Sequence, residues 1–239
     1  MNDLTTTTRT AFMALYESKG IDAVDAKIKS MLSACENGSA AVRDRSTIKG
    51  ELSEVALECH LRYWMERLSY ILTVKGLCIK SIDSRATAEI DVMMATPCRI
   101  YLFECKSFKG KKVLSKECYL KGGSSEKDVY DQSKYHLQIL EPHIGQFRYP
   151  SSSKVSPYQL ILFELSTDDI DDRREDKWKK NIPLLTLDTI DEWLLTELGK
   201  RTEVRWDLAG LTRKLKELNV NSESMFKFHM SKIMNRKKG

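Results

Sequence analysis

Residues 88–106 read AEIDVMMATPCRIYLFECK, and this stretch decides the fold. Two runs, 88–94 and 99–108, are rich in strand-forming residues and are joined by a short Thr96-Pro97-Cys98 turn. Side chains alternate between the two faces of a strand. One face of the second run therefore carries Ile100, Leu102, Glu104 and Lys106, and the other carries Tyr101, Phe103 and Cys105. Because both faces are mainly apolar, we expect this strand to be central in its sheet.

Two charged residues, Glu104 and Lys106, end this apolar strand. Burying a charge is unfavourable unless the charge is paired or binds a metal. If the two runs form a hairpin, Asp91 comes close to Glu104, and two carboxylates aimed at one point suit Mg²⁺. Lys106 could then orient a water molecule or neutralise charge on a phosphate. The alternative from the residues alone is a buried Glu104–Lys106 ion pair without catalytic chemistry.

The same acid-x-lysine spacing occurs at Asp25–Lys27 and Glu175–Lys177. The first lies in a predicted helix and the second in a predicted charged loop, so we interpret both as solvated surface. The spacing alone is therefore a weak signal, and its place at the end of an apolar strand gives it weight.

The rest of the chain alternates helical and strand patterns around this hairpin. Helical spacing covers 8–36, with a break at Gly20, and 45–68. Later residues predict a strand region at 70–82, a lysine-rich loop at 109–125, a helix at 128–140 ending before Pro142, a buried strand at 158–165, a charged loop at 168–180, a strand at 183–187 and a helix at 189–198. This order predicts an α/β fold with one central mixed β-sheet flanked by helices. We divide the chain into an N-terminal helical extension (1–44), a core (45–198) and a basic helical C-terminal segment (199–239).

Composition fits a globular protein of 239 residues with 41% apolar and 31% charged residues. A formal net charge of +5 and a pI of about 8.8 permit nucleic-acid binding without requiring it. The sequence has no apolar stretch of membrane-spanning length and no apolar signal core at its start, so we expect a cytoplasmic protein without membrane contact. Six scattered cysteines are expected to be reduced, and four dispersed histidines are interpreted as ordinary surface or core residues.

The last segment, 200–239, has eleven basic and four acidic residues, a net charge of +7. It also carries Trp206, Leu208, Leu211 and Leu215, so we expect it to be helical and packed. Two interpretations stay open, a DNA-binding appendage and a helical pair that packs on the core.

Four motifs occur in an order that resembles the PD-(D/E)XK nuclease superfamily, and in particular its nuclease-related (NERD) and RecB-like branches. Lys49-Gly50-Glu51-Leu52-Ser53-Glu54 resembles the family's glycine-then-glutamate helix, and Ile90-Asp91-Val92 resembles its metal-binding strand. Glu104-Cys105-Lys106 resembles the E-x-K strand, and Gln132-Ser133-Lys134-Tyr135 resembles the Gln/Tyr motif of the RecB-like group. The resemblance covers about residues 45–165 and implies a restriction-endonuclease-like core, although the proline of the family name is absent.

The resemblance implies a role for each matched residue. Asp91 and Glu104 would bind the metal, helped by the Cys105 backbone carbonyl, and Glu54 would be the upstream acid, with Glu51 as its rival. Lys106 would position the attacking water, and Gln132 would contact phosphate or hold Lys106. Expected nucleic-acid contacts are Tyr135, Arg213, Lys214 and the lysines of the 109–125 loop: Lys109, Lys111, Lys112, Lys116 and Lys121.

Together, these features predict a Mg²⁺-dependent DNA endonuclease, with Mn²⁺ as an expected substitute and no small-molecule cofactor. A homodimer or a partner subunit is possible in this scheme. Two alternatives stay open: a non-catalytic nucleic-acid-binding or assembly protein with a nuclease-like fold, and a nuclease subunit of a restriction, recombination or transposition complex. The sequence does not choose between DNA and RNA, or between nicking and double-strand cleavage.

Overall fold

The computed structural model describes residues 2–36, 42–106, 111–116, 118–123, 125–165, 170–200 and 203–220. Its helices are α1 (Asn2–Lys19), α2 (Ile21–Glu36), α3 (Val42–Arg67), α4 (Val129–Ile144), η1 (Gly145–Phe147), α5 (Asp176–Asn181), α6 (Ile190–Gly199) and α7 (Leu208–Val220). Its strands are β1 (Leu72–Lys80), β2 (Thr87–Ala95), β3 (Ile100–Cys105), β4 (Lys112–Ser115), β5 (Tyr119–Gly122), β6 (Ser125–Asp128), β7 (Tyr158–Phe163), β8 (Ile170–Asp172) and β9 (Leu184–Leu185). The prediction of an α/β fold is confirmed.

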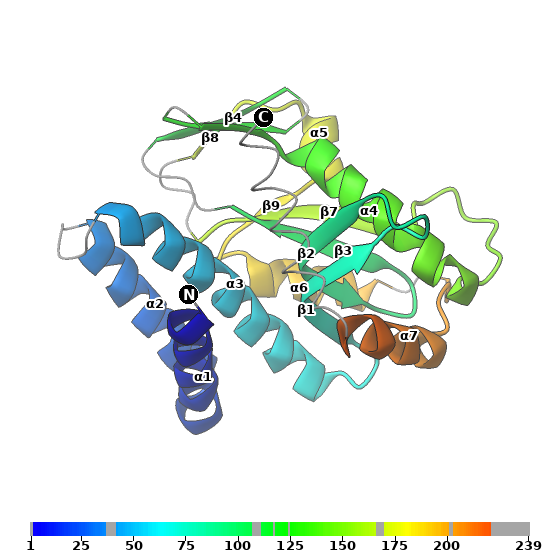
Figure 1. Ribbon diagram of the computed structural model, residues 1–239, viewed down its shortest axis with the longest axis horizontal. Helices are drawn as coiled ribbons and strands as arrows, with labels where there is room; N and C mark the ends of the chain where they lie inside the picture. Colours follow the sequence, from blue (N-terminus) through cyan, green and yellow to red (C-terminus); the bar gives the residue numbers. More distant parts are fainter. Residues whose placement is uncertain are drawn as a thin grey trace.

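The main sheet has the strand order β1-β2-β3-β7-β9 (Figure 1). β1, β2 and β3 are antiparallel neighbours, whereas β7 runs parallel to β3 and β9 runs parallel to β7. The expected hairpin of β2 and β3 is present, and β3 is the central strand. Glu104 therefore lies at the end of the most enclosed strand of the sheet.

Helices cover both faces of this sheet (Figure 1). On one face, Tyr101 and Phe103 of β3 pack in a buried cluster with residues of α3 and α6, and α1 and α2 extend the same cluster outward. On the other face, Ile100 and Leu102 pack with residues of α4 and α7. The predicted alternation of the strand is thereby confirmed, and the helices flank the sheet as expected.

The alternation of β1 and β2 is interrupted at one level of the sheet. Ala88 and Ile90 face the same cluster as Met93 and Ala95, so the pattern shifts by one residue around Asp91. The register pairs Lys75 with Val92 and Leu77 with Ile90, which puts Gly76 opposite Asp91. Gly76 has a φ of +59°, a conformation that L side chains rarely adopt. This interruption turns Asp91 out of the regular pleat.

A second sheet, with the order β6-β5-β4-β8, stands where two loops were predicted. The predictions of loops at 109–125 and 168–180 were therefore wrong for the described residues. β4 pairs with β5 antiparallel and with β8 in parallel, and α5 follows β8. Short strands rich in lysine and glycine lack a clear period, which is why the sequence pattern suggested loops. One sheet was predicted, whereas the described residues form two.

Two helix predictions need correction and extension. The helix predicted to end before Pro142 runs through it to Ile144, so Pro142, which lacks an N–H to donate, lies two residues before the end of the helix. The C-terminal segment contains α7, whose Leu211 and Leu215 are buried against the main sheet with Trp206. The described part of this segment therefore packs on the core, and residues 221–239 lie outside the described residues.

The remaining sequence expectations concern breaks and thiols. Gly20, with a φ of +82°, separates α1 from α2 as predicted. The described cysteines 59, 78, 98, 105 and 118 are free thiols. Within the described part of the chain, no helix has the length and apolar content to cross a membrane.

Candidate active site

The site is centred on Glu104, the next-to-last residue of β3, whose side chain is buried with 2% exposure. The Lys106 ammonium forms an ion pair with Glu104 Oε1. His136 of α4 approaches the other oxygen, with 3.4 Å between His136 Nδ1 and Glu104 Oε2. Both carboxylate oxygens of Glu104 therefore have a cationic or hydrogen-bonding neighbour.

Burial works against the ionisation of Glu104, but His136 and Lys106 outweigh it. The pKa of the Glu104 carboxyl therefore lies below its usual range, and the group is a carboxylate at neutral pH. His136 was interpreted from the sequence as an ordinary surface or core residue, so its contact with Glu104 was missed. The usable signal was spacing: His136 lies four residues after Gln132, on the same face of one helix.

Asp91 stands beside this pair on β2. The pairing of Val92 with Phe103 puts Asp91 opposite Glu104 at the next step of the hairpin. Asp91 Oδ2 accepts a hydrogen bond from the Cys105 backbone N–H at 2.8 Å. Burial and then the charge of Glu104 raise the pKa of Asp91 well above its usual range, against the opposing effect of Lys106. The predicted approach of Asp91 to Glu104 is present.

Two further carboxylates belong to the same neighbourhood. Burial raises the pKa of Glu54 on α3, although Lys75 opposes the shift with its Nζ 3.5 Å from Glu54 Oε2. Burial and the charge of Glu54 raise the pKa of Glu89 on β2. The charge of Glu54 also acts on Asp91, and the charge of Glu51 raises the pKa of Glu54 further. Glu54 is therefore part of the same group of acids as Asp91, and Glu89 was not predicted.

Carboxylates outnumber cations in this cluster. Negative groups that raise one another's pKa values mark a place where a cation is favourable, because each added positive charge relieves their repulsion. Among the described residues, no three or more His, Cys, Asp or Glu side chains are grouped to hold a metal ion. Mg²⁺ commonly uses only one or two carboxylates plus waters and substrate phosphate, so the donor set of Asp91, Glu104 and the Cys105 carbonyl fits it.

The Cys105 side chain lies on the face of β3 opposite Glu104. It packs there against the cluster formed with α3. Burial and then the charge of Asp91 raise the thiol's pKa well above its usual value. A thiolate nucleophile is therefore disfavoured.

The helix α4 carries the other predicted catalytic group. Gln132 is half-buried on the turn before His136, so it lies on the side of α4 that faces the site. Tyr135 is 41% exposed, and its hydroxyl donates to the Thr87 carbonyl oxygen at 3.2 Å. Its hydroxyl is thus tied to β2, while much of its ring remains open to solvent.

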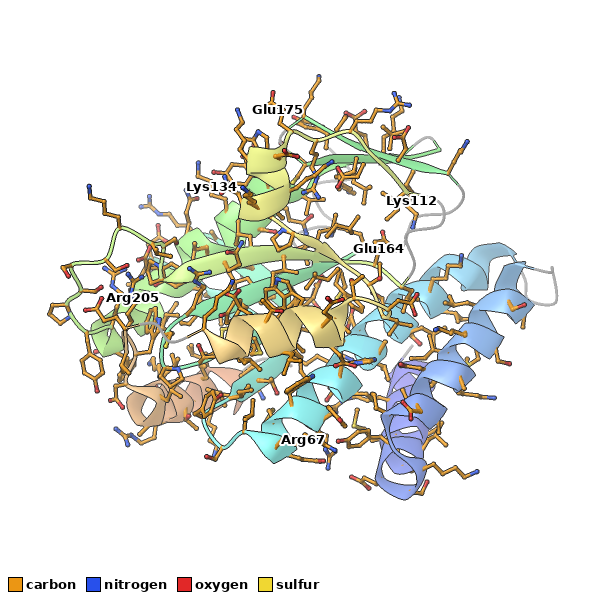
Figure 2. All side chains as sticks on the ribbon, turned by 180° about the vertical axis from the view of Figure 1, so that it is seen from behind. Arg67, Lys112, Lys134, Glu164, Glu175 and Arg205 are labelled. Atoms are coloured by element: carbon orange, nitrogen blue, oxygen red, sulfur yellow. The ribbon has the colours of Figure 1, made fainter. Side chains whose placement is uncertain are left out.

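The predicted nucleic-acid-binding lysines divide into two groups. Lys111, Lys116 and Lys121 are exposed on or beside the small sheet, and Lys109 lies outside the described residues. Lys112 is instead 6% exposed, and its Nζ lies 3.0 Å from Glu164 Oε2 (Figure 2). The expectation that Lys112 presents its charge on a surface loop is wrong, because β4 turns it toward the main sheet.

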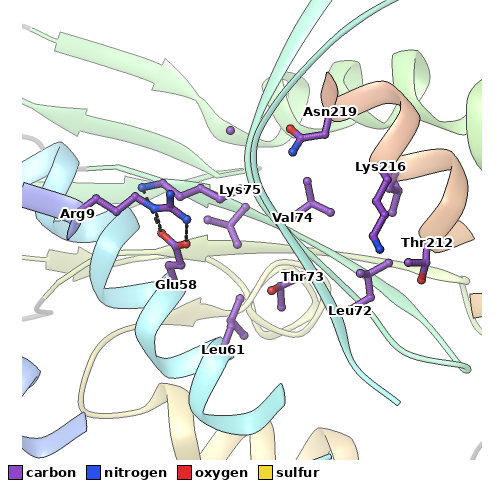
Figure 3. Close-up of a pocket in the computed structure, with 13 residues that line it drawn as sticks. Arg9, Glu58, Leu61, Leu72, Thr73, Val74, Lys75, Thr212, Lys216 and Asn219 are labelled. Atoms are coloured by element: carbon purple, nitrogen blue, oxygen red, sulfur yellow. Dashed lines mark hydrogen bonds and ion pairs between the residues drawn. The ribbon is translucent and has the colours of Figure 1, made fainter. Parts of the chain in front are cut away.

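A groove of about 510 Å³ follows the outer edge of β1 (Figure 3). Its cationic lining residues come from three distant elements: Arg9 of α1, Lys75 of β1 and Lys216 of α7. Arg9 and Lys75 both contact Glu58, and Lys75 also reaches Glu54 of the acid cluster. The groove therefore borders the site. Of the predicted α7 contacts, Arg213 is exposed and Lys214 pairs with Glu217 at 3.2 Å.

Residues 49–163 match the sequence profile of NERD, the nuclease-related domain. This segment belongs to the NERD family. It lies within the restriction-endonuclease-like PD-(D/E)XK superfamily, as the four motifs predicted. The NERD segment starts in α3 and ends with β7, so it holds Glu54, Asp91, Glu104, Lys106 and His136.

Other comparisons add little. No curated protein matches the chain. One solved structure, the crystal structure of a protein of unknown function (AF1548), aligns with a TM-score of 0.29 at 12% identity, covering 70% of this chain and 90% of that one. That similarity carries no argument about this protein. The NERD match and the site geometry are therefore the basis for function.

Proposed function

We propose that the NERD domain is a metal-dependent nuclease that hydrolyses phosphodiester bonds in DNA. The observation that carries the proposal is the meeting of Asp91, Glu104 and Lys106 at one end of the central strands. A purely structural ion pair accounts for Glu104 and Lys106. It does not account for Asp91, whose ionisation is opposed by burial and by Glu104. Maintaining such repulsion is useful where a cation binds.

Mg²⁺ would be held by Asp91, Glu104 and the Cys105 carbonyl, with Glu54 within the same electrostatic neighbourhood. When bound, this ion supplies polarisation of the scissile phosphate and a lower pKa for a bound water. Mn²⁺, which prefers the same oxygen donors, is expected to substitute. His136 would keep Glu104 ionised and fix its orientation, since it approaches the oxygen that Lys106 does not contact.

Lys106 would orient the attacking water and neutralise charge that develops on the phosphate. Its side chain is 15% exposed and forms an ion pair with Glu104. Gln132, one turn from His136, would contact the phosphate from α4. Gln132 lies within α4 and Lys106 directly follows β3, so both side chains start from or beside regular structure, which suits a site that must hold its geometry.

DNA is proposed as the substrate because cations border the site on two sides. The groove along β1 carries Arg9, Lys75 and Lys216. The small sheet presents the exposed Lys111, Lys116 and Lys121 near the end of β3. Cationic side chains bind phosphates without reading bases, so these surfaces support polynucleotide binding and do not choose a sequence.

The test is incubation of the full chain with supercoiled plasmid, linear duplex DNA, single-stranded DNA and RNA, with Mg²⁺ or with chelator. We expect Mg²⁺-dependent cleavage of at least one DNA substrate by the wild type. Asp91→Asn should be inactive, while Asp22→Asn, an exposed residue of α2, should cleave like the wild type. Relaxed circles would indicate nicking and linear products paired cuts. If no polymer is cut with Mg²⁺ or Mn²⁺, the non-catalytic binding alternative replaces the proposal.

A further inference from the structure

Glu164 follows β7 directly, one residue beyond the NERD match. The parallel register pairs Glu104 with Leu162 and Cys105 with Phe163, and the Lys106 N–H donates to the Phe163 carbonyl at 3.1 Å. The next pair in this register is Lys106 and Glu164. Paired residues of neighbouring strands point to the same face of a sheet. Glu164 therefore shares the face of Glu104 and flanks Lys106 from the other side.

The Glu164 carboxylate is 2% exposed, and its two oxygens have different surroundings. Oε2 accepts from Lys112 Nζ at 3.0 Å, and Lys112 is itself buried (Figure 2). Oε1 is buried without a hydrogen-bond partner among the described residues. A buried oxygen that lacks a donor is unfavourable, so its retention calls for an explanation.

Lys106 supplies that explanation. In this structure its ammonium is paired with Glu104 Oε1, while His136 approaches Oε2. A lysine that turns toward substrate must leave Glu104, and it needs another acceptor on the same face to keep its position. Glu164 Oε1 is such an acceptor, one strand away and in register with Lys106.

We propose that Glu164 is a positioning residue of the nuclease site, which holds Lys106 from β7 when Lys106 turns away from Glu104. Lys112 fixes Oε2 and compensates the buried charge, and it leaves Oε1 for Lys106. The inference rests on the proposed function, because it assigns Glu164 a part in the same hydrolysis. The small sheet would then contribute to the site, since its strand β4 carries Lys112, which contacts Glu164.

The charges that face Glu164 come from three elements: Lys112 of β4, Lys49 of α3 and Lys106 after β3. Glu104 lies on the same face. Burial raises the pKa of Glu164 to about 7, and the three lysines oppose that rise. A titration of Glu164 therefore reports which of these cations contact it.

The first experiment follows the ¹³C signal of the Glu164 carboxyl by NMR in the free protein, with Glu164→Gln used to assign it. We expect Lys106→Met to move the titration midpoint upward by about one pH unit, because a nearby opposite charge is lost. Lys177→Met, which removes an exposed lysine of α5, should leave the midpoint unchanged. If Lys112→Met moves the midpoint and Lys106→Met does not, Glu164 serves only Lys112 and the proposal is overturned.

The second experiment measures DNA cleavage. Glu164→Gln should lower kcat by about 10- to 100-fold with little change in KM, because Lys106 loses its alignment. Glu164→Asp should restore part of the rate, while Glu175→Gln, exposed on the N-terminal side of α5, should match the wild type. Wild-type kcat in folded Glu164→Gln overturns the proposal. If the wild type cleaves nothing, the proposed function fails, and the titration in the free protein still decides whether the Lys106 ammonium acts on Glu164.

Discussion

Two charged clusters lie against the main sheet, and they differ in their balance of positive and negative charge. On the α3 face, His60 is 1% exposed between Asp25 of α2 and Asp191 of α6, with 3.0 Å from each ring nitrogen to a carboxylate oxygen. Trp64 Nε1 also donates to Asp191 at 2.8 Å. Every polar atom of the His60 ring has a partner, and the contacts tie three helices together.

At the ends of β2 and β3, the candidate site gathers Glu54 of α3 with Glu89, Asp91 and Glu104 around fewer cations. Burial and then the charge of Glu104 raise the pKa of Asp91, and one oxygen of the nearby Glu164 has no partner among the described residues. A cluster whose charges are all paired stabilises the fold, whereas a cluster with excess negative charge favours the binding of a further cation. The comparison teaches that balance of charge, rather than burial, separates a structural cluster from a candidate site.

The strongest way to break this comparison is Asp91→Asn. We expect cleavage to fall by about 1,000-fold or more, because the change removes a proposed metal ligand. The free energy of unfolding should not fall, since the buried Asp91 carboxylate is repelled by Glu104 and its charge opposes folding. Plasmid cleavage and chemical denaturation measure the two effects. An inactive but strongly destabilised variant would contradict the claim that Asp91 serves function rather than stability.

His60→Leu should have the opposite profile. Burial opposes the charge of His60, but the hydrogen bonds to Asp191 and Asp25 outweigh it and raise its pKa to about 9. Because this pKa lies above the unfolded value of about 6.5, the stabilisation is fully present below pH 6.5 and is lost as pH rises through about 9. We expect a loss of about 3 kcal/mol near pH 6 and little difference from the wild type above pH 10.

Urea unfolding of His60→Leu and wild type across this pH range measures that loss. Glu192→Gln, an exposed change in the first turn of α6, is the matched control and should unfold like the wild type. The folded fraction of His60→Leu should cleave DNA at the wild-type rate. A pH-independent difference in stability would show that packing of the ring, rather than its charge, carries the effect.

His136→Gln tests whether His136 belongs to the candidate site. The His136 hydrogen bond is the largest influence that holds the Glu104 pKa down, so its loss should raise that pKa. We expect cleavage to fall by about 10-fold, and to fall further at acidic pH, where Glu104 becomes protonated. A rate-against-pH profile measures this. A profile equal to that of the wild type would place His136 with the structural histidines, as the sequence first suggested.

Lys216→Glu in the β1 groove is expected to have the smallest effect. It reverses one exposed charge of α7 beside the groove, so DNA binding should weaken several-fold and its salt dependence should decrease. Fluorescence anisotropy with labelled DNA and no divalent metal measures binding apart from cleavage. Lys134→Glu, exposed on α4, is the control for a general change in net charge. Equal weakening by both variants would remove the groove from the binding surface.

How many of the strands could be predicted from the sequence depended on the kind of pattern they carry. Strong apolar alternation located β2 and β3 and the two faces of the hairpin, because those residues are buried on both sides. It did not locate β4, β5, β6 and β8, which are too short and too polar to show a period of their own. β5 pairs with its chain neighbours β4 and β6, whereas β8 joins β4 across a long gap in the chain, and no local window records that last pairing.

The sequence by itself determined the NERD motifs, their order and the approach of Asp91, Glu104 and Lys106, because one short hairpin and its alternation bring them together. Only the tertiary structure decided that His136 contacts Glu104, that Lys112 is buried and that Glu164 flanks Lys106. These three residues reach the site from α4, β4 and the end of β7. Their meeting depends on sheet order and helix packing, and the free energy of those long-range contacts has no signature in neighbouring residues.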